Sequence, residues 1–239
     1  MTLNMAKETA TDRIVRELRE TPAGQADLLL LQEVKQAPGQ GKCSAEQLAS
    51  SLGMHAVYSP AETGVTDQGL AIVSRFPLHD VETKALKRYD LRFRSRSRIV
   101  LAATMDTPWG PVRVVNTHLD TRVNAAQRLE QLQPVIHSAS QFKGPRIVGG
   151  DFNSNPFYWV ANVIPFPALR SQALEVNDFM TGNGFRSAVP VSKTTFDYLR
   201  MHLDWIWLQG LDARESAVYP LAFSDHHAVL TRVEFPSGL

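Results

Sequence analysis

Residues 146–155 read RIVGGDFNSN, and this stretch decides how the rest of the chain is interpreted. Its first half is a short apolar run ending in two glycines, which is typical of a buried strand over 145–150. Asp151 and Asn153 follow at the point where that strand is expected to end. Ligands of open α/β sheets gather at strand ends. The stretch therefore predicts a polar site at the end of a buried strand.

The same arrangement, a polar residue at the end of an apolar run, recurs along the chain. A single carboxylate or histidine at such a place is more often a satisfied structural group. Its recurrence on separate strands favours one shared site instead. The polar residues at these strand ends are Glu33, His118, Asp151, Asn153, Asp204, Asp225 and His226.

Hydrophobic periodicity predicts one α/β domain over residues 1–239, without repeats or a linker. Several strands follow one another without an intervening helix, which predicts mixed sheets and not a simple doubly wound parallel sheet. Trp109 and Gly110 are expected in a hairpin turn, and Ser44 with Gln47 has the spacing of a capping box. Helices are expected near 8–20, 44–53, 124–139 and 170–182, and strands near 27–31, 54–59, 69–74, 98–106, 111–117, 145–150, 203–208, 215–219 and 227–234.

Composition excludes several classes of protein. The chain has 239 residues, 25 Lys and Arg against 24 Asp and Glu, and 44% hydrophobic residues, as an ordinary globular domain has. No stretch approaches the roughly 20 apolar residues of a membrane-spanning helix. Cys43 is the single cysteine, so an internal disulfide and a multi-cysteine zinc site are both excluded.

The residue types at the strand ends point to a particular chemistry. Carboxylates, amides and imidazoles are present, whereas a cysteine nucleophile and a Ser-His-Asp order are not. Hard oxygen ligands of this kind suit Mg²⁺ or Mn²⁺. Such a metal neutralises a phosphoryl oxygen and a leaving alkoxide while a basic group deprotonates water. The set therefore predicts hydrolysis of a phosphoester.

Residues 84–98 form a basic segment, with seven Lys or Arg and one acidic residue, Asp90. Within it arginine recurs at every second position, which on a strand would place four side chains on one face. That face is expected to attract a phosphate-rich substrate; the alternative is an edge strand whose charges prevent aggregation. The four residues are Arg92, Arg94, Arg96 and Arg98.

At these positions the chain resembles the endonuclease/exonuclease/phosphatase superfamily, which includes DNase-I-like nucleases, abasic-site endonucleases, sphingomyelinases and deadenylases. The resemblance implies a four-layer sandwich of two mixed β-sheets flanked by helices, with the active site across one end of the sheets. Seven matching elements in the family's order span nearly the whole chain, which makes the resemblance specific. They are Leu3-Asn4, Leu31-Gln32-Glu33, residues 69–75 (GLAIVSR), residues 116–119 (NTHL), residues 150–153 (GDFN), residues 203–206 (LDWI) and Ser224-Asp225-His226.

The resemblance also implies a metal site. Asn4 and Glu33 would hold the principal Mg²⁺ or Mn²⁺ ion, and Asp225 would bind it or a second ion. Glu33 is the ligand that the resemblance supports best. For Asn4 the structural alternative is a residue that forms a turn.

The remaining matched residues take catalytic roles in the resemblance. Asp151 and Asn153 would position or deprotonate the attacking water, and His118 would stabilise the transition state. His226 would act as general base or phosphoryl stabiliser, oriented by Asp204. The alternatives are a strand-end cap for Asp204 and a core histidine for His118, whereas neighbouring His227 is expected to be structural.

Two parts of the sequence depart from the family pattern. Only Met1, Thr2 and Leu3 precede Asn4, so the first strand is expected to be truncated and an upstream targeting segment would be missing. A cytoplasmic location is our expectation. Residues 156–167 (PFYWVANVIPFP) are aromatic-rich and are expected to pack under a loop, to stack on bases or to enter a lipid interface.

From the sequence we therefore expect a metal-dependent phosphodiesterase that uses direct in-line attack by water. The basic segment slightly favours nucleic acid as the substrate. The nearest alternative is a phospholipid, as for a sphingomyelinase, or another phosphoester. A catalytically silent binding scaffold is the third interpretation. The sequence does not fix the oligomeric state.

Overall fold

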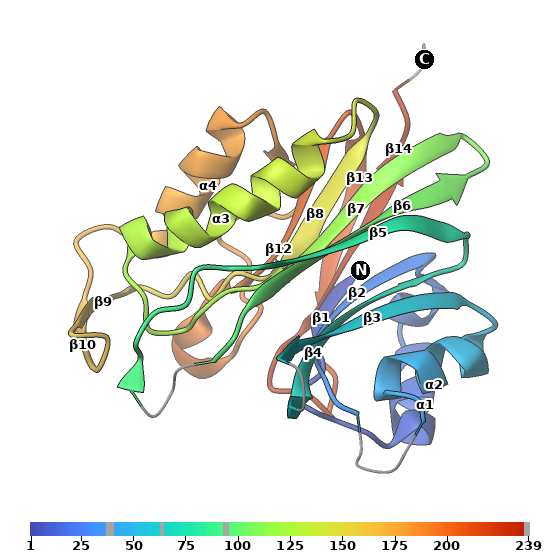
Figure 1. Cartoon of the computed structure of the whole chain (residues 1–239), viewed down its shortest axis with the longest axis horizontal. Coiled ribbons are helices and arrows are strands. Elements are labelled where there is room, and N and C mark those ends of the chain that lie inside the picture. The colour runs from blue at the N-terminus through green and yellow to red at the C-terminus, as the bar shows by residue number, and fades with distance from the viewer. Residues whose placement is uncertain (37–40, 63–64, 93–95, 237–239) are drawn as a thin grey trace.

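The structure is a computed structural model and describes residues 1–36, 41–62, 65–92 and 96–236. Two six-stranded sheets lie face to face, with helices α1 and α2 outside one sheet and α3 and α4 outside the other (Figure 1). This confirms the predicted four-layer sandwich. The sheets are both mixed, because each combines antiparallel pairs with one parallel pair, β1 with β2 and β7 with β8.

The first sheet has the order β13-β14-β1-β2-β4-β3. Its central strand β1 is short, and it pairs with β2 on one side and with β14 on the other. The strands are β1 (Thr2–Asn4), β2 (Leu28–Val34), β3 (His55–Glu62), β4 (Val65–Ser74), β13 (Asp212–Tyr219) and β14 (Ala228–Glu234).

The second sheet has the order β11-β12-β8-β7-β6-β5. Strand β8 lies between β7 and β12, which brings the RIVGGD stretch of residues 146–151 to the centre of the sheet. The strands are β5 (Leu78–Ala85), β6 (Ile99–Thr107), β7 (Gly110–His118), β8 (Arg146–Asp151), β11 (Arg186–Ser187) and β12 (Asp204–Gln209). A separate hairpin joins β9 (Phe157–Val160) to β10 (Ile164–Pro167).

The helices occur where they were predicted. They are α1 (Thr11–Arg19), α2 (Ser44–Leu52), α3 (Ala125–Ser140) and α4 (Gln172–Gly182). The capping box of α2 differs from the prediction by one residue, because the cap is Cys43 and its partner is Glu46. The Glu46 carboxylate accepts from the Cys43 backbone N–H at 2.7 Å, which a glutamine at 47 cannot do from its position in the helix.

Strand β2 explains how one apolar run holds three layers together. Leu29 and Leu31 pack toward α1 and α2, whereas Leu28 and Leu30 pack toward the second sheet. Side chains alternate between the faces of a strand, so a strand covered on both faces needs an uninterrupted apolar run. A third apolar cluster fills the space between the second sheet and helices α3 and α4.

A buried polar link joins the two sheets near the end of β2. The Gln32 amide donates to the Asn116 side-chain oxygen of β7 at 2.7 Å. The Asn116 amide in turn donates to the carbonyl oxygens of Leu31 and Ala71, each at 2.9 Å. Hydrogen bonds between fixed partners allow these buried amides without a large desolvation cost. They also fix the position of the strand that leads to Glu33.

Among the described residues of the basic segment, the expected strand of alternating arginines does not form. Strand β5 ends at Ala85 and β6 begins at Ile99, so the described residues between them lie outside any strand. Arg92 has a positive φ of 56°, and Arg98 is buried in an ion pair of 3.0 Å with Asp120. The two residues therefore do not share a strand face, and Arg94 lies outside the described residues.

Among the described residues, no helix is both long and apolar enough to cross a membrane.

Candidate active site

The site forms where the ends of β7, β8 and β12 meet the end of β1. The register places His118 beside Asp151, and Asp151 beside Asp204. From the first sheet, the Asn4 side chain donates to Asp151 Oδ2 at 3.1 Å. All four of these side chains are buried. The structure thus brings together residues that are up to 200 positions apart in the sequence.

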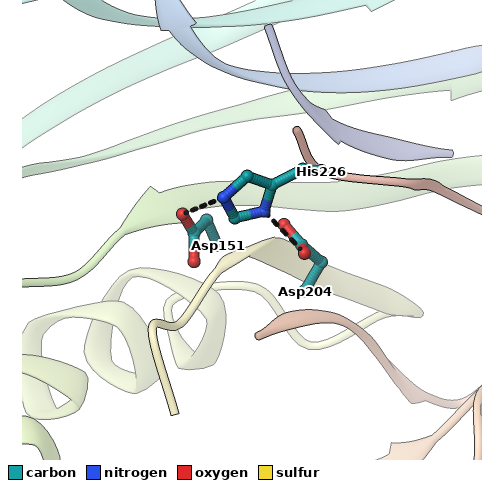
Figure 2. Close-up of side chains that lie close together, drawn as sticks. All are labelled: Asp151, Asp204 and His226. Carbon is teal, nitrogen blue, oxygen red and sulfur yellow. Dashed lines mark hydrogen bonds and ion pairs between the residues drawn. The ribbon is translucent and has the colours of Figure 1, made fainter. Parts of the chain in front are cut away.

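His226 lies between two carboxylates. Its Nδ1 is 2.9 Å from Asp204 Oδ2, and its Nε2 faces Asp151 Oδ2 at 3.8 Å (Figure 2). His118 Nε2 approaches the same Asp151 oxygen to 3.3 Å. The Nδ1 atom is therefore held by Asp204, and the Nε2 edge is directed into the site. This is the pairing of Asp204 with His226 that the resemblance implied.

The two histidines have opposite electrostatic environments. Burial lowers the pKa of His226, but the Asp204 and Asp151 carboxylates outweigh it and raise that pKa to about 10. Burial lowers the pKa of His118 well below its ordinary value, and the Arg98 guanidinium adds to this effect. At neutral pH His226 is therefore cationic and His118 is neutral.

Asp151 is the buried carboxylate between them. Burial raises its pKa to about 6, and the charge of nearby His226 opposes the increase. The backbone N–H of Asn153 donates to Asp151 Oδ1 at 2.9 Å. The Asn153 side-chain amide donates to the Leu119 carbonyl at 2.9 Å. The turn after β8 thus fixes both the carboxylate and the amide that the sequence marked.

The backbone is unusual at Glu33 and at Asn153. Glu33 has a φ of 51° and Asn153 a φ of 49°, and for residues other than glycine such values are uncommon. At Glu33 the pairing of β2 with β4 also shifts its register. Gln32, the residue before it, is the register partner of Asn4. Strained conformations of this kind cluster at functional sites.

The chemistry of the donor set fits a hard divalent cation. Ligand atoms of Asp151, Asp204 and His226 all lie within 4.8 Å of one another. The buried Asp204 Oδ1 has no hydrogen-bond partner among the described residues. Of the three predicted metal ligands, Asn4 is buried, Glu33 is half-buried and Asp225 is exposed. Carboxylate and amide oxygens are the ligands that Mg²⁺ and Mn²⁺ prefer.

Sequence reasoning did not find three residues that support the site. The Thr195 hydroxyl accepts from the backbone N–H groups of Leu203 and Asp204, at 2.9 and 3.1 Å. The Phe196 ring packs on His226 with 4.8 Å between ring centroids. Both lie in a loop without a periodic pattern, so no local signal marks them. Ser224 was quoted as a motif element only, yet its hydroxyl bonds the Asn4 carbonyl at 2.7 Å.

Arg128 of helix α3 is a fourth unpredicted support. It is fully buried, and its guanidinium donates to the carbonyl oxygens of Asp120, Phe152 and Val123 and to the Gln172 side chain. Phe152 lies between Asp151 and Asn153 in the sequence. Arg128 therefore anchors the turn that carries two site residues.

The comparisons with known proteins agree with this geometry. Residues 1–226 match the Endonuclease/Exonuclease/phosphatase family model. The chain therefore belongs to the endonuclease/exonuclease/phosphatase family, a family of phosphoester hydrolases. No curated protein is significantly similar to it in sequence.

Solved structures show the same fold at low sequence identity. An endonuclease/exonuclease/phosphatase from Bacteroides vulgatus is 18% identical with a TM-score of 0.74, over 98% of this chain and 97% of that one. The human Nocturnin catalytic domain with bound sulfate anion is 22% identical with a TM-score of 0.69, over 98% and 92%. ANGEL2, a 2′,3′-cyclic phosphatase, is 18% identical with a TM-score of 0.60, over 92% and 77%.

Proposed function

We propose that the protein is a Mg²⁺-dependent phosphodiesterase in which water attacks phosphorus directly and in line, without a covalent intermediate. The observation that carries the proposal is the position of His226, held by Asp204 and directed toward Asp151. A histidine oriented in this way beside a buried carboxylate has the geometry required for proton transfer and for stabilising a developing negative charge.

In this proposal the chain's own residues have separate tasks. Asp151 and His226 flank the attacking water, so that the Asp151 carboxylate accepts its proton while the cationic His226 donates a hydrogen bond to a phosphoryl oxygen. Asp204 orients His226 through Nδ1 and does not touch the substrate. His118, neutral and buried, donates a hydrogen bond to the pentavalent transition state. Asn153 holds the phosphoryl group, and its backbone N–H fixes Asp151.

Asn4 and Glu33 would hold the metal, with Asp225 at the exposed side of the site. When bound, the ion neutralises the phosphoryl oxygen and the leaving alkoxide. The placement of Glu33 next to the register partner of Asn4 supports this assignment. The exposure of Asp225 suits a ligand that faces incoming substrate.

Nucleic acid is the first substrate that we propose to test. Its support is the concentration of positive charge in residues 84–98, of which Arg88, Arg92 and Arg96 are exposed. The arginines do not share a strand face, so such a face does not support the nucleic-acid proposal. The buried Arg98 forms an ion pair with Asp120 instead. Arg92 and Arg96 therefore remain proposed substrate contacts, and the same proposal holds for Arg94.

A phospholipid or another phosphoester is the second candidate. The exposed apolar side chains of the β9–β10 hairpin favour it, since a nucleic-acid groove would not need them. A silent scaffold would not need the buried Asp204 and Asp151 beside His226, because unpaired burial of charge is costly.

Nicking of supercoiled plasmid in Mg²⁺ at low salt tests the proposal. We expect nicking by the wild type, none after addition of EDTA, and none by His226→Ala. The matched control is His227→Ala, which removes the neighbouring imidazole and leaves the site intact. Nicking that persists in His226→Ala would contradict the assignment of the site.

A folded, metal-binding wild type that leaves plasmid intact would overturn the nucleic-acid preference. Hydrolysis of phosphatidylcholine or of bis(4-nitrophenyl) phosphate would then support the second candidate. A wild type that gains no thermal stability from Mg²⁺ and hydrolyses none of these substrates would overturn the enzymatic proposal itself.

A further inference from the structure

Exposed apolar side chains concentrate in one short segment. Ten large hydrophobic residues of the described part are exposed, and five of them lie within residues 158–169. Single exposed apolar residues are ordinary, whereas a contiguous group marks a surface that binds something. The five are Tyr158, Val160, Ile164, Phe166 and Leu169.

Four of these side chains form one continuous face. In the β9–β10 hairpin Tyr158 pairs with Phe166, and Val160 pairs with Ile164. Side chains on directly opposed residues point to the same side of a two-stranded ribbon. Their exposed fractions are 54, 52, 42 and 53% respectively, so the whole face is open. Leu169 is fully exposed directly after the hairpin.

The hairpin is held rigidly against the body of the protein. Trp159 exchanges two hydrogen bonds with the Asn124 side chain, at 2.6 and 2.9 Å. At the turn, the Asn162 amide donates to the Arg122 carbonyl and to Gln127 Oε1. Ala161 and Asn162 both have positive φ, and the Val163 N–H donates to the Val160 carbonyl at 3.1 Å, which closes the turn. The apolar face is therefore preformed.

An apolar groove of about 440 Å³ continues this face toward helix α4. Most of its lining is apolar, with the charges of Arg170 and Glu175 at its edge. Arg170 is paired with Glu175 and with Asp178, so these charges largely cancel. Besides Ala125 of α3, the apolar and aromatic lining residues are Phe157, Tyr158, Phe166, Pro167, Ala168 and Leu169.

Positive charge borders the hairpin on its other side. Gln127 of α3 contacts both Asn162 of the hairpin and Tyr89 of the basic segment, which places the two segments side by side. Arg88 and Arg92 are exposed in that segment, and Arg122 lies over the Trp159 ring. Residues 156–169 contain no charged residue, and the acidic residues beside the arginines are Asp90 of the basic segment and Glu130, which pairs with Lys87. The surface therefore combines apolar and cationic character.

This combination of apolar and cationic surface fits a lipid bilayer better than it fits a nucleic acid or a second copy of the chain. Val160, Ile164 and Leu169 have no ring to stack on a base, which argues against a nucleic-acid platform. A second copy of the chain would bring the same cations against one another. Aromatic and aliphatic side chains beside arginines suit the boundary between acyl chains and anionic headgroups.

We propose that the β9–β10 hairpin docks the protein onto membrane surfaces that carry anionic lipids, with Tyr158, Val160, Ile164 and Phe166 entering the interface. Arg88, Arg92 and Arg122 then face the headgroups. The hairpin follows the Asp151–Asn153 turn by a few residues, and Trp159 Nε1 bonds Asn155 at 3.1 Å, so docking holds the active site close to the lipid surface. The proposal does not depend on which phosphoester is hydrolysed.

Flotation of the full chain with vesicles tests the proposal. We expect binding to phosphatidylcholine vesicles that contain phosphatidylglycerol, weaker binding to pure phosphatidylcholine, and weakening by added salt. The double variant Ile164→Ser with Phe166→Ser should lose about tenfold or more of the bound fraction per lipid. The matched control is Val81→Ser with Trp109→Ser, which removes two exposed apolar side chains elsewhere and should bind as the wild type does.

Insertion has its own readout. Phe166→Trp should show fluorescence quenched by brominated acyl chains, and a tryptophan that stays in water would overturn the proposal. Equal loss of binding in both double variants, or no binding by the folded wild type, would also overturn it. The proposal would likewise be overturned if the wild type were a dimer that the Ile164→Ser with Phe166→Ser variant makes monomeric. It would also be overturned if that variant lost binding to single-stranded DNA and kept its binding to vesicles. Unchanged hydrolysis of bis(4-nitrophenyl) phosphate in the hairpin variant separates docking from catalysis.

Discussion

Folded proteins usually bury apolar side chains and expose charged ones. The active site and the β9–β10 hairpin depart from this rule in opposite directions. Around His226, ionisable groups are buried, with Asp204 completely inaccessible. On the hairpin, Phe166 and Ile164 are apolar and yet half exposed. Burial of charge and exposure of apolar surface both cost free energy in an isolated chain. The comparison teaches that each departure is explained by a function that we propose for the region: binding of a phosphoryl group in one case and of a lipid surface in the other.

The largest effect is expected from removing His226, the histidine of the buried polar site. His226→Ala should lower kcat/KM for bis(4-nitrophenyl) phosphate by about two to four orders of magnitude, because it removes a group that touches the reacting atoms. Steady-state kinetics measure this effect, and circular dichroism checks the fold. His227→Ala should retain activity near that of the wild type. A comparable loss in His227→Ala would show that the effect is structural.

Glu33→Ala tests the assignment of the metal ligands. The rate at a fixed Mg²⁺ concentration should fall because the ion binds more weakly, and higher Mg²⁺ or added Mn²⁺ should restore part of it. Metal titration of the rate gives the apparent affinity. His226→Ala is the control, since its loss is not one that metal restores. Equal rescue of the two variants would contradict both assignments.

Arg128→Met tests how much the buried Arg128 guanidinium contributes to the free energy of unfolding. We expect a loss of about 3 kcal/mol in the free energy of unfolding, because the carbonyls of Asp120, Phe152 and Val123 lose their donor. Urea unfolding measures the loss. Arg16→Met on the exposed side of α1 is a control for loss of an arginine, with an expected change within about 0.5 kcal/mol. A small effect in Arg128→Met would mean that water replaces the guanidinium.

Asp204→Asn should have the smallest effect of this series, about tenfold to a hundredfold on kcat. The amide keeps the size of the side chain, and the backbone N–H of residue 204 still donates to the Thr195 hydroxyl, so His226 is loosened and not removed. A pre-steady-state measurement of the chemical step gives the value. If Asp204→Asn were more damaging than His226→Ala, Asp204 would act on the substrate and the pairing would be wrong.

Much of the fold could be predicted because the sequence of each buried strand is an apolar run that ends in a polar residue. Strand β8 is the clearest example, and the resemblance of the residues around Asp151 gave the layer order that periodicity alone did not. Strand β5 was missed because its residues are mostly exposed and charged, as an edge strand permits. The hairpin was missed as a strand pair because Pro165 and Pro167 are poor strand formers.

The candidate site was predicted in part for a similar reason. His118, Asp151 and Asp204 stand at strand ends and were brought together by the register. Thr195 and Phe196 support the site from an irregular loop, whose path is set by tertiary packing and not by local pattern. Alternation places the arginines on one shared face only if the segment is extended, and the described residues of this segment lie outside any strand. The Arg98 and Asp120 pair shows that one of them serves the core.

The hydrogen bond from Asn4 to Asp151 has a consequence for how this molecule can be monitored. It joins the two sheets at the site itself, in addition to the Gln32–Asn116 link and the aliphatic side chains packed between them. Any slippage of one sheet over the other is transmitted to the catalytic carboxylate, although the helices and strands themselves persist. Turnover is therefore a more sensitive gauge of sheet-to-sheet alignment than circular dichroism. Heating or an overpacked sandwich should abolish the rate at temperatures where secondary structure is still intact.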